Sequence, residues 1–174
     1  MHHLFRIVLI VICSIGIAVA SLAAETVSYP EKDPLFAVEV PSGWEAKHEN
    51  GAVKIMGEAN AIFLLQHVDN VKDESTAQAA VAELAALEAR QFKMENVKIA
   101  EPGRPIRIGD FTGFITDGRG TDKHGHDTLW QVMIFAPKEA DYYLLSCWWA
   151  NDDAEKTAAD LAGILKSLKP ISPN

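Results

Sequence analysis

The pattern of hydrophobic and polar positions changes period along the chain. From Leu35 apolar and polar residues alternate, as they do in strands, and between Ala77 and Lys93 the period becomes helical. Strand-like segments then return and continue to Ala150. A second helical period follows, and its apolar stripe consists of Leu161, Ile164, Leu165 and Leu168. The predicted order is therefore strands, helix, strands, helix.

Tight turns between the predicted strands indicate antiparallel pairing. The pair Asn50-Gly51 is the strongest of these signals, because both residues adopt a positive φ at low cost. The segment P-K-E-A-D joins the strands predicted over 128–136 and 142–150. Parallel strands would instead need long crossover connections. We therefore predict a mainly antiparallel sheet.

Two segments, 61–68 and 142–150, are apolar on both faces. This pattern is typical of central strands that are buried on both sides. Each face of the sheet then needs a cover, and the two amphipathic helices supply one each. The predicted fold class is α+β, a three-layer α/β/α sandwich around a mainly antiparallel sheet. The second segment contains Cys147, which we interpret as a buried structural cysteine rather than a nucleophile with His67 or His48 as its base.

The ends of the two helices carry capping signals. Ser75 and Gln78 have the spacing of a capping box, which predicts the start of the first helix. Its buried stripe is predicted to contain Ala77, Val81, Leu84, Leu87 and Phe92. Asp152 or Asp153 is the predicted cap of the second helix.

The first residues have the composition of a signal peptide. A short basic start precedes an apolar run from Ile7 to Ala20, and small residues follow up to Ala23. The run is short for a membrane span, which needs about 20 apolar residues. An uncleaved anchor is the alternative. Cys13 is not preceded by the small residue that a lipoprotein site requires, so we expect no lipidation there.

These features divide the chain into a signal peptide (1–23), a flexible leader (24–34) and a single domain (35–170). The leader contains two prolines and has no apolar period. After cleavage we expect no stable membrane insertion, and the predicted localisation is periplasmic or secreted.

The chain is acidic, with 16 Lys and Arg against 24 Asp and Glu and a net charge of −8. Removal of Arg6 with the signal peptide leaves 15 against 24, a net charge of −9. This charge argues against nucleic acid or an anionic membrane surface as a partner. Cys147 is then the only cysteine, so an intramolecular disulfide is excluded.

The start F-A-V-E-V-P-S-G-W, followed by a hairpin, a strand and a helix, resembles the PsbP-like superfamily. The late aromatic strand and the terminal helix ending in L-K-S-L-K-P resemble it too. The resemblance covers Leu35 to Lys169. It implies an antiparallel sheet sandwiched by helices, in a group that includes the photosystem II subunit PsbP and bacterial DcrB-like envelope proteins. Accessory and assembly roles are more frequent there than catalysis, and the resemblance assigns no functional residue.

The best chemical candidate is the polar loop D-G-R-G-T-D-K-H-G-H-D, residues 117–127. His124 and His126 lie two apart, so their rings project to the same side of an extended segment. Asp122 adds a carboxylate, with Asp127 and Asp117 as further candidates. Imidazole and carboxylate ligands suit zinc and other borderline divalent metals. The alternative interpretation is a solvated hairpin tip without a ligand.

Trp130 adjoins this loop and Arg119 lies within it, and together they form the predicted binding surface. The leading hypothesis is a non-catalytic exported binding or accessory protein of the bacterial envelope, without a cofactor. Its partner would be an envelope protein or a small ligand. The alternative is a metal-binding protein or metal-dependent enzyme that uses His124 and His126. A structural factor specific to one lineage is a third hypothesis.

Overall fold

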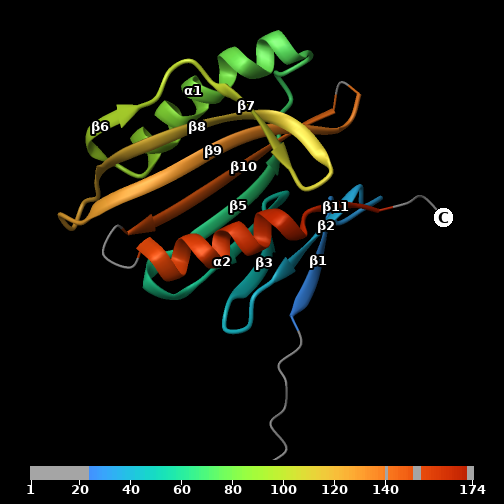
Figure 1. The fold of residues 1–174 in the computed structure, drawn as a ribbon, viewed down its shortest axis with the longest axis horizontal. Helices are drawn as coiled ribbons and strands as arrows, with labels where there is room; N and C mark the ends of the chain where they lie inside the picture. Colours follow the sequence, from blue (N-terminus) through green and yellow to red (C-terminus); the bar gives the residue numbers. More distant parts are fainter. Residues whose placement is uncertain (1–23, 140, 151–153, 172–174) are drawn as a thin grey trace, which may run out of the picture.

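The computed structural model describes residues 24–139, 141–150 and 154–171 (Figure 1). The predicted signal peptide and the caps predicted at Asp152 and Asp153 lie outside these residues. The elements are β1 (Glu25–Tyr29), β2 (Phe36–Val40), β3 (Glu45–Glu49), β4 (Ala52–Met56), the short 3-10 helix η1 (Glu58–Asn60), β5 (Ile62–His67), α1 (Glu74–Gln91), β6 (Glu95–Ile99), β7 (Arg104–Ile108), β8 (Phe111–Thr121), β9 (Asp127–Lys138), β10 (Asp141–Ala150), α2 (Ala154–Ser167) and β11 (Lys169–Pro170).

A large antiparallel sheet forms the middle layer. Its strands follow the order β3-β4-β5-β10-β9-β8-β6, and β7 also pairs with β8. The helix α1 packs on one face, against β8, β9 and β6, whereas α2 packs on the other face against β10 and β2 (Figure 1). This arrangement confirms the predicted α+β sandwich. A small sheet in the order β1-β2-β11 shares the face with α2, which the sequence analysis did not predict.

The main strand predictions are confirmed. Asn50 and Gly51 have φ angles of 51° and 76° and connect β3 to β4, as a two-residue hairpin requires. The strand β10 lies between β5 and β9, and its residues Tyr142 to Trp148 are buried. Cys147 is 1% exposed. The most apolar segment of the chain is therefore a central strand.

The predicted cap of α1 is wrong, and its predicted stripe is confirmed for Ala77 and Val81 but wrong for Leu87 and Phe92. Its N-cap is Asp73 rather than Ser75, because the carboxylate of Asp73 accepts a hydrogen bond from the backbone N–H of Thr76 at 2.8 Å. The buried stripe consists of Ala77, Val81, Ala85, Glu88 and Ala89. Leu87 and Phe92, predicted to be buried, are each 42% exposed. The helix turns its small side chains toward the sheet, which lets the two layers approach closely.

The predicted flexible leader is wrong for Glu25–Tyr29, which form β1. These residues pair along β2 from Val40 to Phe36, and both Val27 and Tyr29 are buried. The alternation E-T-V-S-Y is present in the sequence, but it spans only five residues. At the other end of the chain, β11 pairs with the same strand, opposite Ala37 and Phe36.

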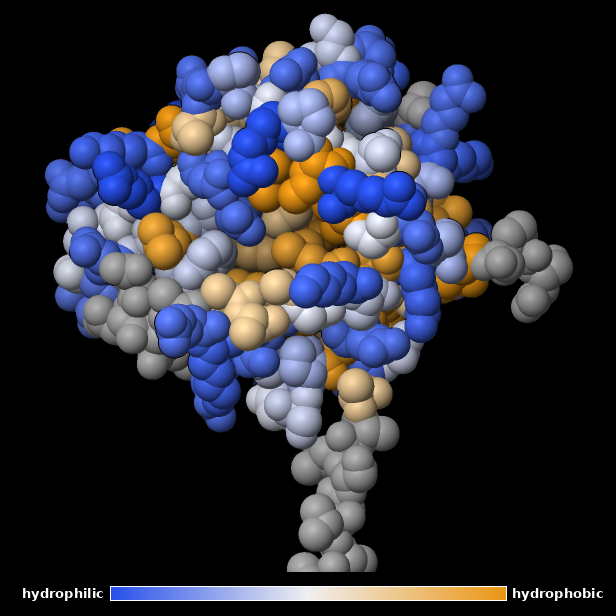
Figure 2. All heavy atoms as spheres, in the orientation of Figure 1, coloured by the Kyte–Doolittle hydropathy of each residue, from blue (hydrophilic) through white to orange (hydrophobic). Residues whose placement is uncertain are grey.

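The face under α2 holds a core of large side chains. Phe36 lies at its centre, 0% exposed, with ring centroids 5.1 to 6.1 Å from those of Tyr29, Phe111, Phe135 and Tyr143. Hydrophobic side chains remain visible in the middle of the molecule in Figure 2, so the cover is incomplete. The partly buried hydrophobic residues packed against this core are Leu35, Trp44, Ala46, Ile106, Trp149 and Leu165.

The face under α1 is filled from the sheet. Trp130 and Trp148 lie opposite the alanines of the helix, and their rings stack with centroids 4.7 Å apart and planes 11° apart. Gly118 makes room for the indole of Trp130, because a Cβ at Gly118 would lie 2.1 Å from that ring. This glycine of the G-R-G sequence therefore serves packing.

Candidate functional site

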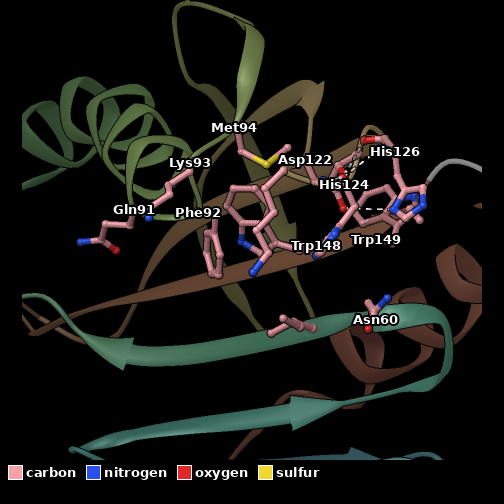
Figure 3. A pocket seen from close by; sticks show the side chains of 14 residues that line it. Asn60, Gln91, Phe92, Lys93, Met94, Asp122, His124, His126, Trp148 and Trp149 are labelled. Atoms are coloured by element: carbon pink, nitrogen blue, oxygen red, sulfur yellow. Dashed lines mark hydrogen bonds and ion pairs between the residues drawn. The ribbon is translucent and has the colours of Figure 1, made fainter.

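A cavity of about 340 Å³ opens at one end of the large sheet (Figure 3). The antiparallel register brings its walls together, because Ile62 pairs with Trp148, Thr128 with Ala150 and Thr121 with Asp127. The start of β5, the end of β10 and the tip of the β8–β9 hairpin therefore meet at the same edge. The last turn of α1 closes the fourth side. We call this cavity the sheet-end pocket.

The chain leaves α1 through a tight turn that shapes the pocket rim. The backbone N–H of Met94 donates to the carbonyl of Ala89 at 2.9 Å, and that of Lys93 donates to Arg90 at 3.1 Å. These two bonds form a Schellman motif, whose left-handed position glycine usually occupies. Here Lys93 occupies it, with a φ of 55°. The turn places Phe92, Lys93 and Met94 on the pocket rim.

Trp148 forms a rigid wall of the pocket. One contact is the parallel stack on Trp130, and the ring centroid of Phe92 lies 4.6 Å away at an interplanar angle of 52°. The indole N–H of Trp148 donates to Oε2 of Glu88 at 3.2 Å. Ring contacts and a hydrogen bond therefore fix both the plane and the direction of this side chain.

Glu88 is the functional candidate that sequence reasoning missed. It is 5% exposed beneath α1, and its other carboxylate oxygen accepts a hydrogen bond from the hydroxyl of Ser146. Burial raises the pKa of Glu88 to about 7, against the opposing effect of the hydrogen bonds from Ser146 and Trp148. A signal was present, because Ala77, Val81 and Ala85 are followed at helical spacing by Glu88.

Asp122 organises the hairpin tip. Its Oδ1 accepts hydrogen bonds from the backbone N–H groups of His124 at 2.8 Å and His126 at 2.9 Å. Its Oδ2 lies 3.2 Å from Nδ1 of His126. These hydrogen bonds, with the backbone bond from His126 as the largest effect, lower the pKa of Asp122. Residues 117–121 of the predicted polar loop belong to β8 and Asp127 belongs to β9, so the connection is limited to residues 122–126.

The predicted metal ligands lie together on the pocket wall. The rings of His124 and His126 have centroids 6.2 Å apart, and both residues line the pocket with Asp122. Asp117 lies elsewhere, bound to the amide of Gln131 at 2.8 Å and to Arg104 at 2.9 Å. Among the residues that the structure describes, no group of three or more His, Cys, Asp or Glu side chains is arranged to hold a metal ion. Metal binding at the tip stays a prediction.

The predicted binding surface is only partly assembled. Trp130 is 1% exposed, so a ligand cannot contact it directly. Its ring supports the pocket wall by stacking on Trp148. Arg119 is exposed on β8, but it projects from the face opposite that of Gly118 and does not line the pocket. Trp130, predicted as part of the binding surface, is therefore buried, because its indole occupies the space beside Gly118 of the neighbouring strand.

Cys147 does not lie beside His67, the histidine of the neighbouring strand β5. The sheet pairs Cys147 with Phe63 and Tyr143 with His67, so the thiol and the imidazole lie four positions apart along the strands. Both ring nitrogens of His67 are engaged, with Asp69 and Asp141 at 2.9 Å each. Burial is the main cause that raises the pKa of the Cys147 thiol.

Comparison with known proteins shows the class of fold. No protein-family model matches the sequence, and neither does any curated protein. Solved structures with a PsbP-like fold do match, in agreement with the resemblance predicted from the strand motifs. No helix of the described residues is long and apolar enough to cross a membrane.

Three of these solved structures span nearly the whole chain. LpqN of Mycobacterium tuberculosis, described as involved in cell envelope biogenesis, has a TM-score of 0.57 at 13% identity, over 85% of this chain and 91% of its own. Cyanobacterial PsbP (CyanoP) of Synechocystis sp. PCC 6803 has a TM-score of 0.58 at 9% identity, over 88% and 96%. The Ran-binding protein Mog1p of Saccharomyces cerevisiae has a TM-score of 0.54 at 10% identity, over 86% and 96%. At these identities the likeness establishes the fold alone.

Proposed function

We propose that this protein is a non-catalytic exported binding or accessory protein of the bacterial envelope, and that it binds its partner in the sheet-end pocket. The observation that carries the proposal is the construction of the pocket. An aromatic wall, fixed by Trp130 and Glu88, faces a rim of polar side chains around a cavity of about 340 Å³. Ligand sites are typically concave and largely apolar, with a few polar groups that orient the ligand.

Two further observations support an envelope role. The predicted signal peptide over 1–23 would export the chain, and its acidic composition suits a soluble product. LpqN, which shares the fold, is described as involved in cell envelope biogenesis. An accessory protein of the same compartment is consistent with both.

The environment of the candidate nucleophile supports a non-catalytic role. A reactive cysteine needs a thiolate in an exposed, electropositive setting. Cys147 is instead buried in the central strand, and the raised pKa of its thiol disfavours the thiolate. The Asp122 carboxylate, the acidic group on the pocket wall, is engaged by the backbone of its own turn.

The test fills the pocket with an added ring. Met94 lines the pocket, so Met94→Trp places an indole inside it. Leu87→Trp adds the same group to an exposed site of α1 outside the pocket and serves as the control. Envelope extract is passed over each immobilised protein, and retained molecules are identified by mass spectrometry. We expect the wild type and Leu87→Trp to retain the same species and Met94→Trp to lose them. Equal retention by all three proteins would show that the pocket is not the binding site. No specific retention by the wild type would refute the binding role.

The alternative function is metal binding at the hairpin tip. It is favoured by the juxtaposition of His124, His126 and Asp122 on one wall of the pocket. The double variant His124→Ala/His126→Ala should then abolish any zinc-dependent rise in Tm, whereas His48→Ala on β3 should leave that rise intact. A wild-type Tm that does not respond to zinc would remove this alternative.

A further inference from the structure

We infer that the sheet-end pocket selects an organic anion, whose apolar body contacts Phe92, Met94 and Trp148 and whose charged group is bound by Lys93 and Lys123. This inference rests on the proposed function, because it names the class of ligand for the same pocket.

The charges around the pocket differ from those of the whole chain. The protein has a net charge of −8, yet two lysines line the pocket against one carboxylate, that of Asp122. That carboxylate already accepts hydrogen bonds from the backbone of its own turn. Neither Lys93 nor Lys123 forms an ion pair with a residue of the described ranges. Their ammonium groups are therefore available to a ligand.

The end of α1 contributes an opposing charge. A helix C-terminus carries the equivalent of about half a negative charge, which would repel an anion. The carbonyls of Ala89 and Arg90 accept hydrogen bonds from Met94 and Lys93, which reduces this effect. Two full positive charges on long, rotatable stems outweigh the remainder. The local balance thus favours an anion, and the acidic surface beyond would repel one that missed the pocket.

The backbone at Lys93 provides independent support. Position 93 has a φ of 55°, a conformation that glycine adopts without cost and that other residues adopt with strain. A lysine at this position retains a charged side chain where glycine would fit the turn better. In Figure 3 Lys93 lies on the α1 side of the pocket. Lys123 belongs to the connection between β8 and β9, so positive groups approach the pocket from two elements.

The size of the cavity limits the ligand. A cavity of about 150 Å³ holds one benzene molecule. A cavity of about 340 Å³ accommodates roughly twice that volume, a molecule of about a dozen non-hydrogen atoms. The probes are decanoate and 2-naphthoate, which represent a chain and a ring of this size. Each is paired with its uncharged alcohol, 1-decanol or 2-naphthalenemethanol.

Binding of the four probes is measured by calorimetry at low salt, with the wild type and three variants. We expect at least one anion to bind about tenfold more tightly than its alcohol, because a charge-assisted hydrogen bond contributes that factor. Lys93→Gly and Lys123→Gln should each lower the affinity for the anion by about threefold to tenfold and leave the affinity for the alcohol unchanged. Lys72→Gln, at the opposite end of α1, removes the same charge and should change neither.

The variants separate the two proposals. Lys93→Gly relieves the left-handed strain, so its Tm should not fall, and weaker binding cannot then be attributed to misfolding. If an alcohol binds as tightly as its anion, the inference is overturned while the pocket remains a binding site. If neither anions nor alcohols bind, both the inference and a small-ligand function fail. Equal losses in Lys72→Gln and the two pocket variants would indicate a general charge effect and also overturn the inference.

Discussion

The two faces of the large sheet are filled from opposite directions. Over one face, α2 supplies large side chains, including Leu161 and Ile164, which meet aromatic rings of the sheets. Over the other, α1 supplies mainly alanines, and the stacked indoles of Trp130 and Trp148 occupy the volume between the layers. In the described residues, the face under α1 has the buried carboxyl group and the sheet-end pocket. Each face is covered by one helix, but the face under α2 forms a hydrophobic core, whereas the face under α1 also forms the candidate binding site.

The largest expected effect comes from matched phenylalanines. Phe36→Ala should lower the free energy of unfolding by about 3–5 kcal/mol, because the removed ring is fully buried among four others. Phe92→Ala removes the same atoms from a side chain that is 42% exposed, and should cost less than about 1.5 kcal/mol. Urea unfolding measures both. Equal losses would mean that Phe92 belongs to a core and the two faces do not differ as described.

The next effect concerns the buried carboxyl group. The pKa of Glu88 is raised from its ordinary value of 4.5 to about 7, so the folded protein binds this proton more tightly than the unfolded chain. The stability that it contributes is full below about pH 4.5 and is lost as the pH rises through 7. Glu88→Gln imitates the protonated form, since its amide can accept from Trp148 and donate to Ser146.

We therefore expect Glu88→Gln to match the wild type near pH 4.5 and to exceed it at pH 8 by up to about 3 kcal/mol, since one pKa unit is equivalent to about 1.4 kcal/mol. Thermal or urea unfolding at both pH values gives the difference. Ser146→Ala is the control, because it removes a hydrogen bond and leaves the carboxyl group in place. A stability gain that is the same at both pH values would show that Glu88 does not titrate as described.

The smallest expected effect lies at the start of α1. Asp73→Ala should destabilise the fold by about 1 kcal/mol, because it removes the acceptor for the N–H of Thr76. Ser75→Ala, at the cap position that the sequence pattern favoured, should change stability by less than about 0.5 kcal/mol. The pair is compared by urea unfolding at neutral pH. A larger loss in the serine variant would contradict the assigned cap.

Much of the fold could be predicted from the sequence because its signals are local. A segment that is apolar on both faces identifies β10, and the Asn50-Gly51 pair identifies the hairpin between β3 and β4, without knowledge of any distant residue. The stripe of α1 could not be obtained in this way. Its burial depends on the indoles that face it, so the small residues, rather than Leu87 and Phe92, turn inward. Strand β1 was missed because its alternation covers only five residues, which form a strand by pairing with β2.

The site was predicted in part. The sequence pointed to the region of His124, His126 and Asp122, and the structure places all three on the pocket wall. It could not show that Lys93, about thirty residues earlier, lies across the same cavity, because the end of α1 meets the hairpin tip only through tertiary packing. Glu88 was missed because a glutamate in a helix is usually solvated. Its carboxylate is buried against Ser146 and Trp148, which donate hydrogen bonds to it and are distant from it in the sequence.

The short strand β2 has a mechanical consequence for the chain ends. It is flanked by β1 and β11, and both neighbours run antiparallel to it. Glu25 lies opposite Val40, whereas Pro170 lies opposite Phe36, so the chain enters β1 and leaves β11 at opposite ends of the small sheet. Tension between the first and last described residues would slide the three strands past one another in shear, and their hydrogen bonds would share the load instead of opening one by one.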